Sequence, residues 1–184
     1  MGKLVVCDSP IEGVYVIETN AFGDNRGIFA RWFCDRELAQ IFSGQKIVNV
    51  NYSKTIRKGS IRGMHFQNPP DTETKLVRCI SGRVLDVVVD IRRESPTFLK
   101  YFAVELSSER MNMIFVPKGF AHGFQSLEDD CEIMYLVTQY YSPENEGGLN
   151  AFDPRIGIQW PLNVTDMSDK DRNRSFIDGD FQGI

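Results

Sequence analysis

Short strand-like segments, separated by turn residues at nearly regular intervals, are the feature that most constrains the fold of this chain. From residue 47 to residue 141, runs rich in β-branched and aromatic residues predict a succession of strands. These are Ile47–Ser53, Ser60–Phe66, Lys75–Ile80, Arg83–Ile91, Tyr101–Leu106, Met113–Val116, Gly123–Leu127 and Cys131–Tyr141. So many short strands are typical of a closed barrel or a double sheet, which leaves few exposed strand edges.

The N-terminal part of the chain predicts two more strands and a helix. The strands are expected over Ile11–Glu18 and Ile28–Phe33, with a turn at residues 22–27 between them. Asp35 can cap a short helix over Arg36–Ser43, which the following glycine would end.

The C-terminal part of the chain loses the strand pattern after Pro161 and continues as a polar tail. Its one helical stretch is weak and runs from Asp169 to Phe176. We therefore expect a single all-β domain over residues 1–184, with one short N-terminal helix and a weakly helical tail.

Composition excludes several classes of partner. The net charge of −4 provides no basic surface for a nucleic acid. The apolar run Leu4–Cys7 is too short for a signal peptide or a membrane span. The four cysteines are widely spaced and form no C-x-x-C pair, as expected of buried thiols in a reducing compartment. These features predict a cytoplasmic protein without a nucleic-acid or membrane partner.

The strand Arg83–Ile91 carries two carboxylates on one face. Asp86 and Asp90 alternate with valines there, because successive side chains of a strand point to opposite faces. One interpretation is a polar barrel interior with a ligand cavity. The other is that both carboxylates face water, and the sequence leaves both open.

Both histidines of the chain lie in short motifs. His65 lies in Arg62-Gly63-Met64-His65-Phe66-Gln67, and His122 ends Pro117-Lys118-Gly119-Phe120-Ala121-His122. Histidine is the side chain that most readily carries protons near neutral pH. The two motifs therefore indicate concentrated proton chemistry.

These motifs resemble the two signatures of the cupin superfamily, whose fold is a jelly-roll barrel, also called a double-stranded β-helix. Gln67 stands where metal-binding cupins have their second histidine, so a three-histidine metal site cannot form in this chain. A site of both histidines with Asp71 or Glu73 stays open as an alternative. The substitution favours a cupin without a metal.

A longer series of motifs, in order along the chain, closely resembles the dTDP-4-dehydrorhamnose 3,5-epimerase family, from about Ile11 to Asp171. The family acts on nucleotide-linked 4-keto-6-deoxy sugars. The motifs are Arg62–Gln67, Lys75–Cys79, Asp86–Arg92, Ser95–Phe98, Pro117–Phe124 and Tyr140–Pro143.

The resemblance implies a catalytic set. His65 matches the general base, Asp171 the carboxylate that orients it, Tyr135 the proton donor on the opposite face of the sugar, and Lys75 the cation beside the C4 oxygen. Such chemistry needs neither a metal nor another cofactor, because the ketone of the substrate acidifies the neighbouring carbon.

The resemblance also implies a substrate, a set of binding residues and an assembly. The substrate is a nucleotide-diphosphate 4-keto sugar, and the assembly is a homodimer that pairs through sheets and exchanges N-terminal strands. Phosphate contacts are matched by Arg26 and Arg62, and nucleotide contacts by Asn49 and Asn51. Other substrate contacts are matched by His122, Glu146 and Lys170.

Simpler interpretations exist for some of these residues. Asp171 could complete a helix cap with Ser168, Tyr135 could pack within a strand, and Lys75 could be a charge on an edge strand. Under strict alternation Arg62 and His65 point to opposite faces, so they share a pocket only if the intervening glycine distorts the strand.

Two departures from the family pattern concern the nucleotide. Arg31 stands where a glutamate is common, and Val50 stands where an aspartate is usual, which would alter base recognition. The sequence therefore leaves the base open, as well as the choice of C3, C5 or both. The alternatives are a single-site epimerase acting on a CDP or GDP sugar, a metal-dependent cupin enzyme, a ketoisomerase and a non-catalytic binding module.

Overall fold

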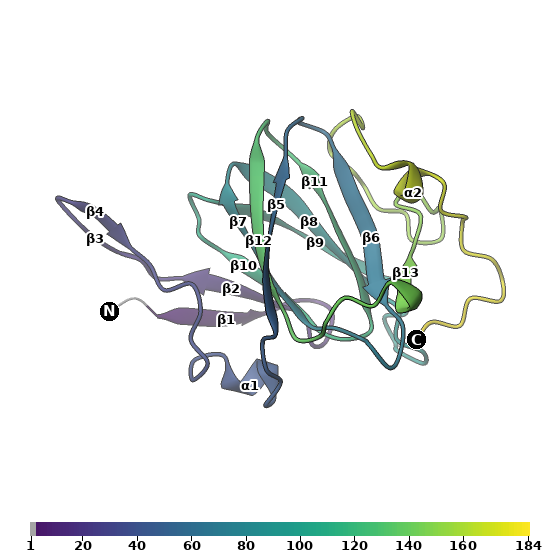
Figure 1. The fold of residues 1–184 in the computed structure, drawn as a ribbon, viewed down its shortest axis with the longest axis horizontal. Helices are drawn as coiled ribbons and strands as arrows, with labels where there is room; N and C mark the ends of the chain where they lie inside the picture. The colour runs from purple at the N-terminus through teal and green to yellow at the C-terminus, as the bar shows by residue number, and fades with distance from the viewer. Residues whose placement is uncertain (1–2) are drawn as a thin grey trace.

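Two antiparallel sheets pack against each other to form the body of the protein (Figure 1). The computed structural model describes residues 3–184, so Met1 and Gly2 of the expected domain lie outside the described residues. In spatial order, the larger sheet comprises β1 (Leu4–Asp8), β2 (Tyr15–Thr19), β10 (Met113–Val116), β7 (Lys75–Ser81), β12 (Cys131–Val137) and β5 (Asn49–Thr55). The smaller sheet comprises β13 (Glu146–Gly148), β6 (Ile61–Gln67), β11 (Phe120–Ser126), β8 (Arg83–Asp90) and β9 (Tyr101–Ser107).

The prediction of an all-β fold is confirmed. From β5 to β8 and from β9 to β13 consecutive strands lie in alternate sheets, as in a jelly roll, whereas β8 and β9 pair within the smaller sheet. Three short helical turns complete the structure: α1 (Ala39–Phe42), the 3₁₀ turn η1 (Pro143–Asn145) and α2 (Asp169–Arg172). No helix within residues 3–184 is long and apolar enough to cross a membrane.

Three apolar layers hold the sheets. The first lies between them and includes Val84 and Val88 of β8. The second covers the outer face of the smaller sheet, where Val87 and Val89 of the same strand meet the C-terminal tail. The third covers the outer face of the larger sheet beneath α1. Strand β8 is therefore buried on both faces, as its dense run of valines requires.

The two carboxylates of β8 are both fully buried, so the interpretation that they face water is wrong. Asp90 accepts hydrogen bonds from Arg92, Ser95 and Thr97 and thereby fixes the turn that follows the strand. Asp86 instead faces His122.

The N-terminal region departs most from the sequence predictions. Residues 11–13 form a turn, so the expected strand begins only at Tyr15. Of the strand expected over Ile28–Phe33, only the first two residues are confirmed, because β4 (Gly27–Phe29) ends at Phe29 and pairs with β3 (Phe22–Asp24) as a short hairpin. This hairpin projects away from both sheets (Figure 1).

Several expected elements are shorter than predicted. The helix expected over Arg36–Ser43 has only one turn, because the Asp35 carboxylate accepts from the backbone N–H of the next residue instead of capping it. The last strand ends at Val137, four residues before Tyr141, and the tail helix ends at Arg172.

The four cysteines are free thiols, and Cys79 and Cys131 are buried. Burial raises the pKa of the Cys79 thiol to about 12. This thiol is therefore protonated and unreactive at neutral pH.

A close crossing of β6 and β11 resolves the conflict between Arg62 and His65. His65 pairs with His122 and Arg62 with Phe124, so Gly63 and Met64 together oppose one residue, Gly123. Gly63 has a φ of +131°, and a Cβ there would lie 2.5 Å from the Gly123 Cα. The expected distortion at Gly63 is confirmed, and it turns both side chains into one cavity.

Substituting alanine for Gly63 tests this crossing. Gly63→Ala adds a backbone clash to a strained φ, and we expect it to lower the free energy of unfolding by roughly 3–5 kcal/mol. Gly27 is a matched control, because its φ is +136° and no atom lies within 4 Å of an added Cβ. Gly27→Ala should cost only about 1–2 kcal/mol in the same urea titration. Equal losses would contradict the clash.

Candidate active site

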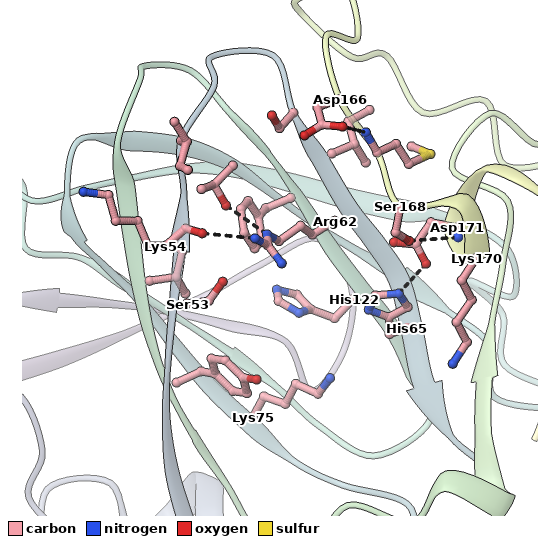
Figure 2. A pocket seen from close by; sticks show the side chains of 18 of the residues that line it. Ser53, Lys54, Arg62, His65, Lys75, His122, Asp166, Ser168, Lys170 and Asp171 are labelled. Atoms are coloured by element: carbon pink, nitrogen blue, oxygen red, sulfur yellow. Dashed lines mark hydrogen bonds and ion pairs between the residues drawn. The ribbon is translucent and has the colours of Figure 1, made fainter.

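A cavity of about 680 Å³ lies between the two sheets (Figure 2). Its walls come from β5, β7 and β12 of the larger sheet, from β6, β11 and β13 of the smaller sheet, and from α2. Eight of the predicted site residues line it: Arg62, His65, Lys75, His122, Tyr135, Glu146, Lys170 and Asp171. A second cavity of about 280 Å³ shares several of these residues and adds Asn49 and Asn51.

His65 and Asp171 form a hydrogen-bonded pair. The imidazole Nε2 lies 2.6 Å from Asp171 Oδ1. Burial alone would raise the pKa of Asp171, but the hydrogen bond and charge of His65, together with the contact to Ser168, outweigh it and lower that pKa. Asp171 is therefore a carboxylate that can only accept, so Nε2 carries the ring proton and Nδ1 is the atom free to take another.

The same residues also form the helix cap that was the simpler interpretation of Asp171. Ser168 is the N-cap of α2, and its hydroxyl accepts from the Asp171 backbone N–H at 3.1 Å. Capping uses the backbone of Asp171 and leaves its side chain for His65 (Figure 2). Asp171 can therefore be both a helix-cap residue and the hydrogen-bond partner of His65.

Lys75 and Tyr135 line both cavities from neighbouring strands. Strand β7 lies inside its sheet between β10 and β12, so the interpretation of Lys75 as an edge charge is wrong. The lysine Nζ lies 3.0 Å from Glu73 Oε1. Burial, with the charge of Glu73 adding to it, raises the pKa of Tyr135, so its phenol is protonated at neutral pH.

His122 is held by a carboxylate that the sequence analysis did not assign to the site. Both oxygens of Asp86 lie 2.9 Å from His122 Nε2. Burial raises the pKa of Asp86, and the proximity of His122 opposes that rise. The alternation of Asp86 with valines on β8 was the signal that could have identified this residue.

Two polar groups on β5 hold Arg62. Its Nε donates to the Thr55 hydroxyl, and its Nη2 donates to the Lys54 carbonyl, both at 3.0 Å. The guanidinium is thus fixed at the cavity wall, with donors left for a planar anion.

Glu146 is the centre of a cluster at the junction of the two cavities. Lys170 Nζ and the Tyr141 hydroxyl each lie 2.6 Å from its Oε2. Lys170, followed by Tyr141, lowers the pKa of Glu146, which is therefore ionised.

The two departures from the family pattern lie outside the cavities. Val50 points to the outer face of β5 and is 61% exposed, whereas its neighbours Asn49 and Asn51 line the second cavity. Arg31 forms an ion pair with Glu37, which also accepts from the backbone N–H of Leu4. Neither Arg31 nor Val50 therefore lines a cavity of its own chain, and their effect on base recognition stays a prediction.

Arg26 is the one predicted site residue that lies elsewhere. It sits at the tip of the β3–β4 hairpin, pairs with Asp24, and its side chain is 85% exposed. Neither of the two cavities includes a hairpin residue in the part of the chain that the structure describes. The structure therefore does not bring Arg26 together with the other predicted site residues within one chain, and its phosphate contact stays a prediction.

Gln67, at the position of a cupin metal ligand, braces two loops. Its Nε2 donates to the carbonyls of Asp71 and Tyr140, and its Oε1 accepts from the Ser142 N–H. Asp71 and Glu73, the carboxylates of the metal alternative, accept from Gln139 and pair with Lys75, respectively. Over residues 3–184, no group of three or more His, Cys, Asp and Glu side chains is arranged to hold a metal.

Comparisons with known proteins point to one family. A family model described as dTDP-4-dehydrorhamnose 3,5-epimerase matches residues 8–178. The dTDP-4-dehydrorhamnose 3,5-epimerase of Salmonella typhimurium is 40% identical over 178 residues, covering 95% of this chain and 96% of the relative.

Two solved structures have the same fold. The Legionella pneumophila dTDP-6-deoxy-D-glucose-3,5-epimerase, in complex with dTDP-4-keto-L-rhamnose, has a TM-score of 0.90 and 35% identity, covering 98% of this chain and 97% of that one. A 3′-monoepimerase from Streptomyces bikiniensis, in complex with dTDP-quinovose, has a TM-score of 0.84 and 34% identity, covering 91% and 85%.

Removing the charge of Asp171 tests the pair with His65. The carboxylate favours the imidazolium, so Asp171→Asn should lower the pH at which half of His65 is protonated by about one unit. Asp169→Asn, on an exposed position of the same helix, is the control and should change it little. Nitrogen-15 NMR titration measures both, because the chain has only two histidines. An unchanged midpoint in Asp171→Asn would count against the pair.

Proposed function

The chain belongs to the dTDP-4-dehydrorhamnose 3,5-epimerase family and is an isomerase, and we propose that His65, Lys75, Tyr135 and Asp171 carry its chemistry. The substrate is a nucleotide-linked 4-keto-6-deoxyhexose of the dTDP-4-dehydro-6-deoxyglucose type, which the enzyme epimerises at C3, C5 or both. The observation that carries the assignment of residues is the His65–Asp171 pair, which shares one cavity with Tyr135 and Lys75.

The first step is removal of a proton from carbon next to the ketone. Nδ1 of neutral His65 takes the proton, and the C–H electron pair moves through the new C–C double bond onto the C4 oxygen. Asp171 stabilises the resulting imidazolium through Nε2. A positioned base of this kind typically contributes ~10²–10⁴-fold.

The enolate oxygen needs a nearby positive charge. Lys75 provides it from the wall of the cavity, where its ammonium is held by Glu73 before the substrate arrives. Cations fixed where negative charge develops in the transition state are often the largest contribution to catalysis.

Inversion requires that the proton return from the other face. Tyr135 lies on β12 and His65 on β6, in opposite sheets, so a sugar ring between them meets a base on one side and an acid on the other. The phenol donates its proton to the carbanionic carbon. Solvent then reprotonates the tyrosinate and takes the proton from His65.

The remaining residues bind the nucleotide diphosphate. Arg62 suits the pyrophosphate, because its planar donors are fixed by Thr55 and by the Lys54 carbonyl. Asn49 and Asn51 offer amides to the nucleoside from the second cavity. His122, Glu146 and Lys170 surround the sugar.

A homodimer accounts for the position of Arg26. The hairpin that carries it projects into solvent and exposes Phe22, Ile28 and Phe29, an apolar surface that favours a protein partner. In a two-fold dimer each hairpin would reach the cavity of the other subunit, and Arg26 would contact the phosphates there.

A cytoplasmic location is part of the proposal. The buried residues Cys79 and Cys131 are free thiols. Reduced thiols of this kind are typical of a reducing compartment.

A single-site epimerase is the second candidate. The likeness to a 3′-monoepimerase favours it, since the same base, acid and cation serve one carbon as well as two.

Deuterium exchange tests the chemistry. In D₂O the enzyme should place deuterium at C3, C5 or both of dTDP-4-dehydro-6-deoxyglucose, as followed by NMR. We expect His65→Asn to slow exchange at least ~100-fold while dTDP binding, measured by calorimetry, changes little. Tyr135→Phe should slow inversion more than exchange. Asp169→Asn is the control, and full exchange by His65→Asn would exclude His65 as the base.

Mixing two weakly active variants tests whether each active site contains residues of both subunits. Arg26→Ala and His65→Asn should each be weakly active alone, but unfolding and refolding them together forms heterodimers. If Arg26 acts on the partner's cavity, one of the two sites in each heterodimer is intact, and activity should recover to about one quarter of the wild-type value. Recovery would be absent if Arg26 served its own chain or if the protein were a monomer.

A further inference from the structure

Arg174 places a guanidinium over Gly148, the residue paired with His65, and the chemistry above does not use it. Strand β13 pairs with β6 so that Gly148 lies directly opposite His65. A Cβ at Gly148 would lie 2.6 Å from Cζ and Nε of Arg174. The guanidinium therefore occupies the place of a side chain at position 148. Opposite residues of an antiparallel pair project to the same face, with Cβ atoms about 4.5–5.5 Å apart.

The position of Arg174 is fixed by its own backbone and by burial. Its carbonyl accepts from Asn150 Nδ2 at 2.6 Å, and its N–H donates to the Asp171 carbonyl. Within residues 3–184, the buried donors Nε and Nη2 have no hydrogen-bond partner. The acid nearest to them is Glu146, whose Oε1 lies 3.7 Å from Nη2.

The two cations of Glu146 differ in exposure. The Lys170 side chain is 57% exposed, whereas the Arg174 side chain is 20% exposed and packs over Gly148. Lys170 is free to turn toward a substrate phosphate or hydroxyl. Arg174 would then be the cation that stays with Glu146.

Charged groups face His65 from every element around it. They are Asp171 and Lys170 of α2 with Asp166 before it, Glu146 of β13 with Tyr141 before it, Lys75 of β7 with Glu73, Tyr135 of β12, Lys54 of β5, His122 of β11 with Asp86, and Arg62 of β6. Asp171 is hydrogen-bonded to His65, and Glu146 lies close enough for the two charges to interact, so both carboxylates favour the protonated imidazole. A base that is already protonated cannot remove a proton from carbon.

We propose that Arg174 is a positioning residue that holds Glu146 in place and whose fixed charge keeps His65 neutral, and thus able to accept a proton. The inference rests on the proposed function, in which neutral His65 is the base. It adds a residue that reaches His65 from the tail, across Gly148, without lining the cavity itself. It also explains why position 148 carries no side chain, since a Cβ there would displace the guanidinium.

Charge variants at position 174 test the inference directly on His65. Arg174→Gln keeps hydrogen-bonding groups but removes the charge, so the His65 titration midpoint, measured by nitrogen-15 NMR, should rise by roughly 0.5–1 pH unit. Arg174→Lys should restore most of the wild-type midpoint. Arg172→Gln removes the same charge from an exposed position two residues away and should leave the midpoint unchanged.

A double variant separates charge from folding defects. Glu146→Gln alone should lower the midpoint, and Glu146→Gln with Arg174→Gln should return it close to the wild-type value. On the acidic side, the pH profile of kcat/KM for Arg174→Gln should be displaced from that of the wild-type enzyme. The displacement should equal the difference between their NMR midpoints. At high pH the two enzymes should then be equally active.

Two results would overturn the role of Arg174. One is a midpoint in Arg174→Gln that matches Arg172→Gln. The other is an equal loss of kcat/KM at every pH with no displacement of the pH profile. If wild-type enzyme showed no epimerisation, the proposed function would fail instead. The NMR midpoints would still report whether Arg174 acts on His65.

Discussion

The hydrogen bond between His65 and Asp171 joins the middle of the chain to its tail, and the rest of the site is arranged around it. The two residues are 106 positions apart in the sequence. Asp171 reaches the imidazole only because Ser168 begins a helix at that point and because the tail packs on the outer face of the smaller sheet. The tail therefore contributes to the chemistry as well as to the core. The same tail brings Lys170 and Arg174 to Glu146.

The orientation of His65 depends in turn on a contact between two glycines. Gly63 and Gly123 approach so closely that neither position has room for a Cβ. Their contact lets β6 use two residues where β11 uses one, and the side chains on either side of the distortion then share the cavity. The strict alternation of a regular strand would have separated the arginine from the histidine.

Much of the fold could be predicted from the sequence, because strands with period-two patterns and turn residues between them are local signals. Strand β10 has the predicted bounds, and the other barrel strands from β5 to β12 were located to within a few residues. The N-terminal hairpin was missed, since its short strands are exposed on both faces and carry no alternating pattern. The turn that carries Arg26 was predicted, but the projection of the hairpin away from both sheets was not.

The cavity residues differ in how far the sequence could identify them. Motifs pointed to His65 and Lys75. Asp171, the partner of His65, comes from the distant tail, whereas Glu73 lies only two residues before Lys75, and no local pattern relates its carboxylate to that lysine within the cavity. Asp86 had a signal in its alternation with valines, although that signal fitted a water-facing strand equally well. Arg174 had none, because its place depends on a glycine in another strand.

The side-chain amide of Gln67 holds two loops beside the cavity in place. Both of its N–H groups and its oxygen are engaged by the loops at residues 68–71 and 140–142. A neutral imidazole has one donor and one acceptor, so a histidine at this position could not satisfy all three backbone groups. A histidine there would leave at least one of these backbone groups without its partner, and Tyr141, which lines both cavities, belongs to one of the two loops. The amide at residue 67 thus fixes the loops beside the cavities at the very position where other cupins bind an ion.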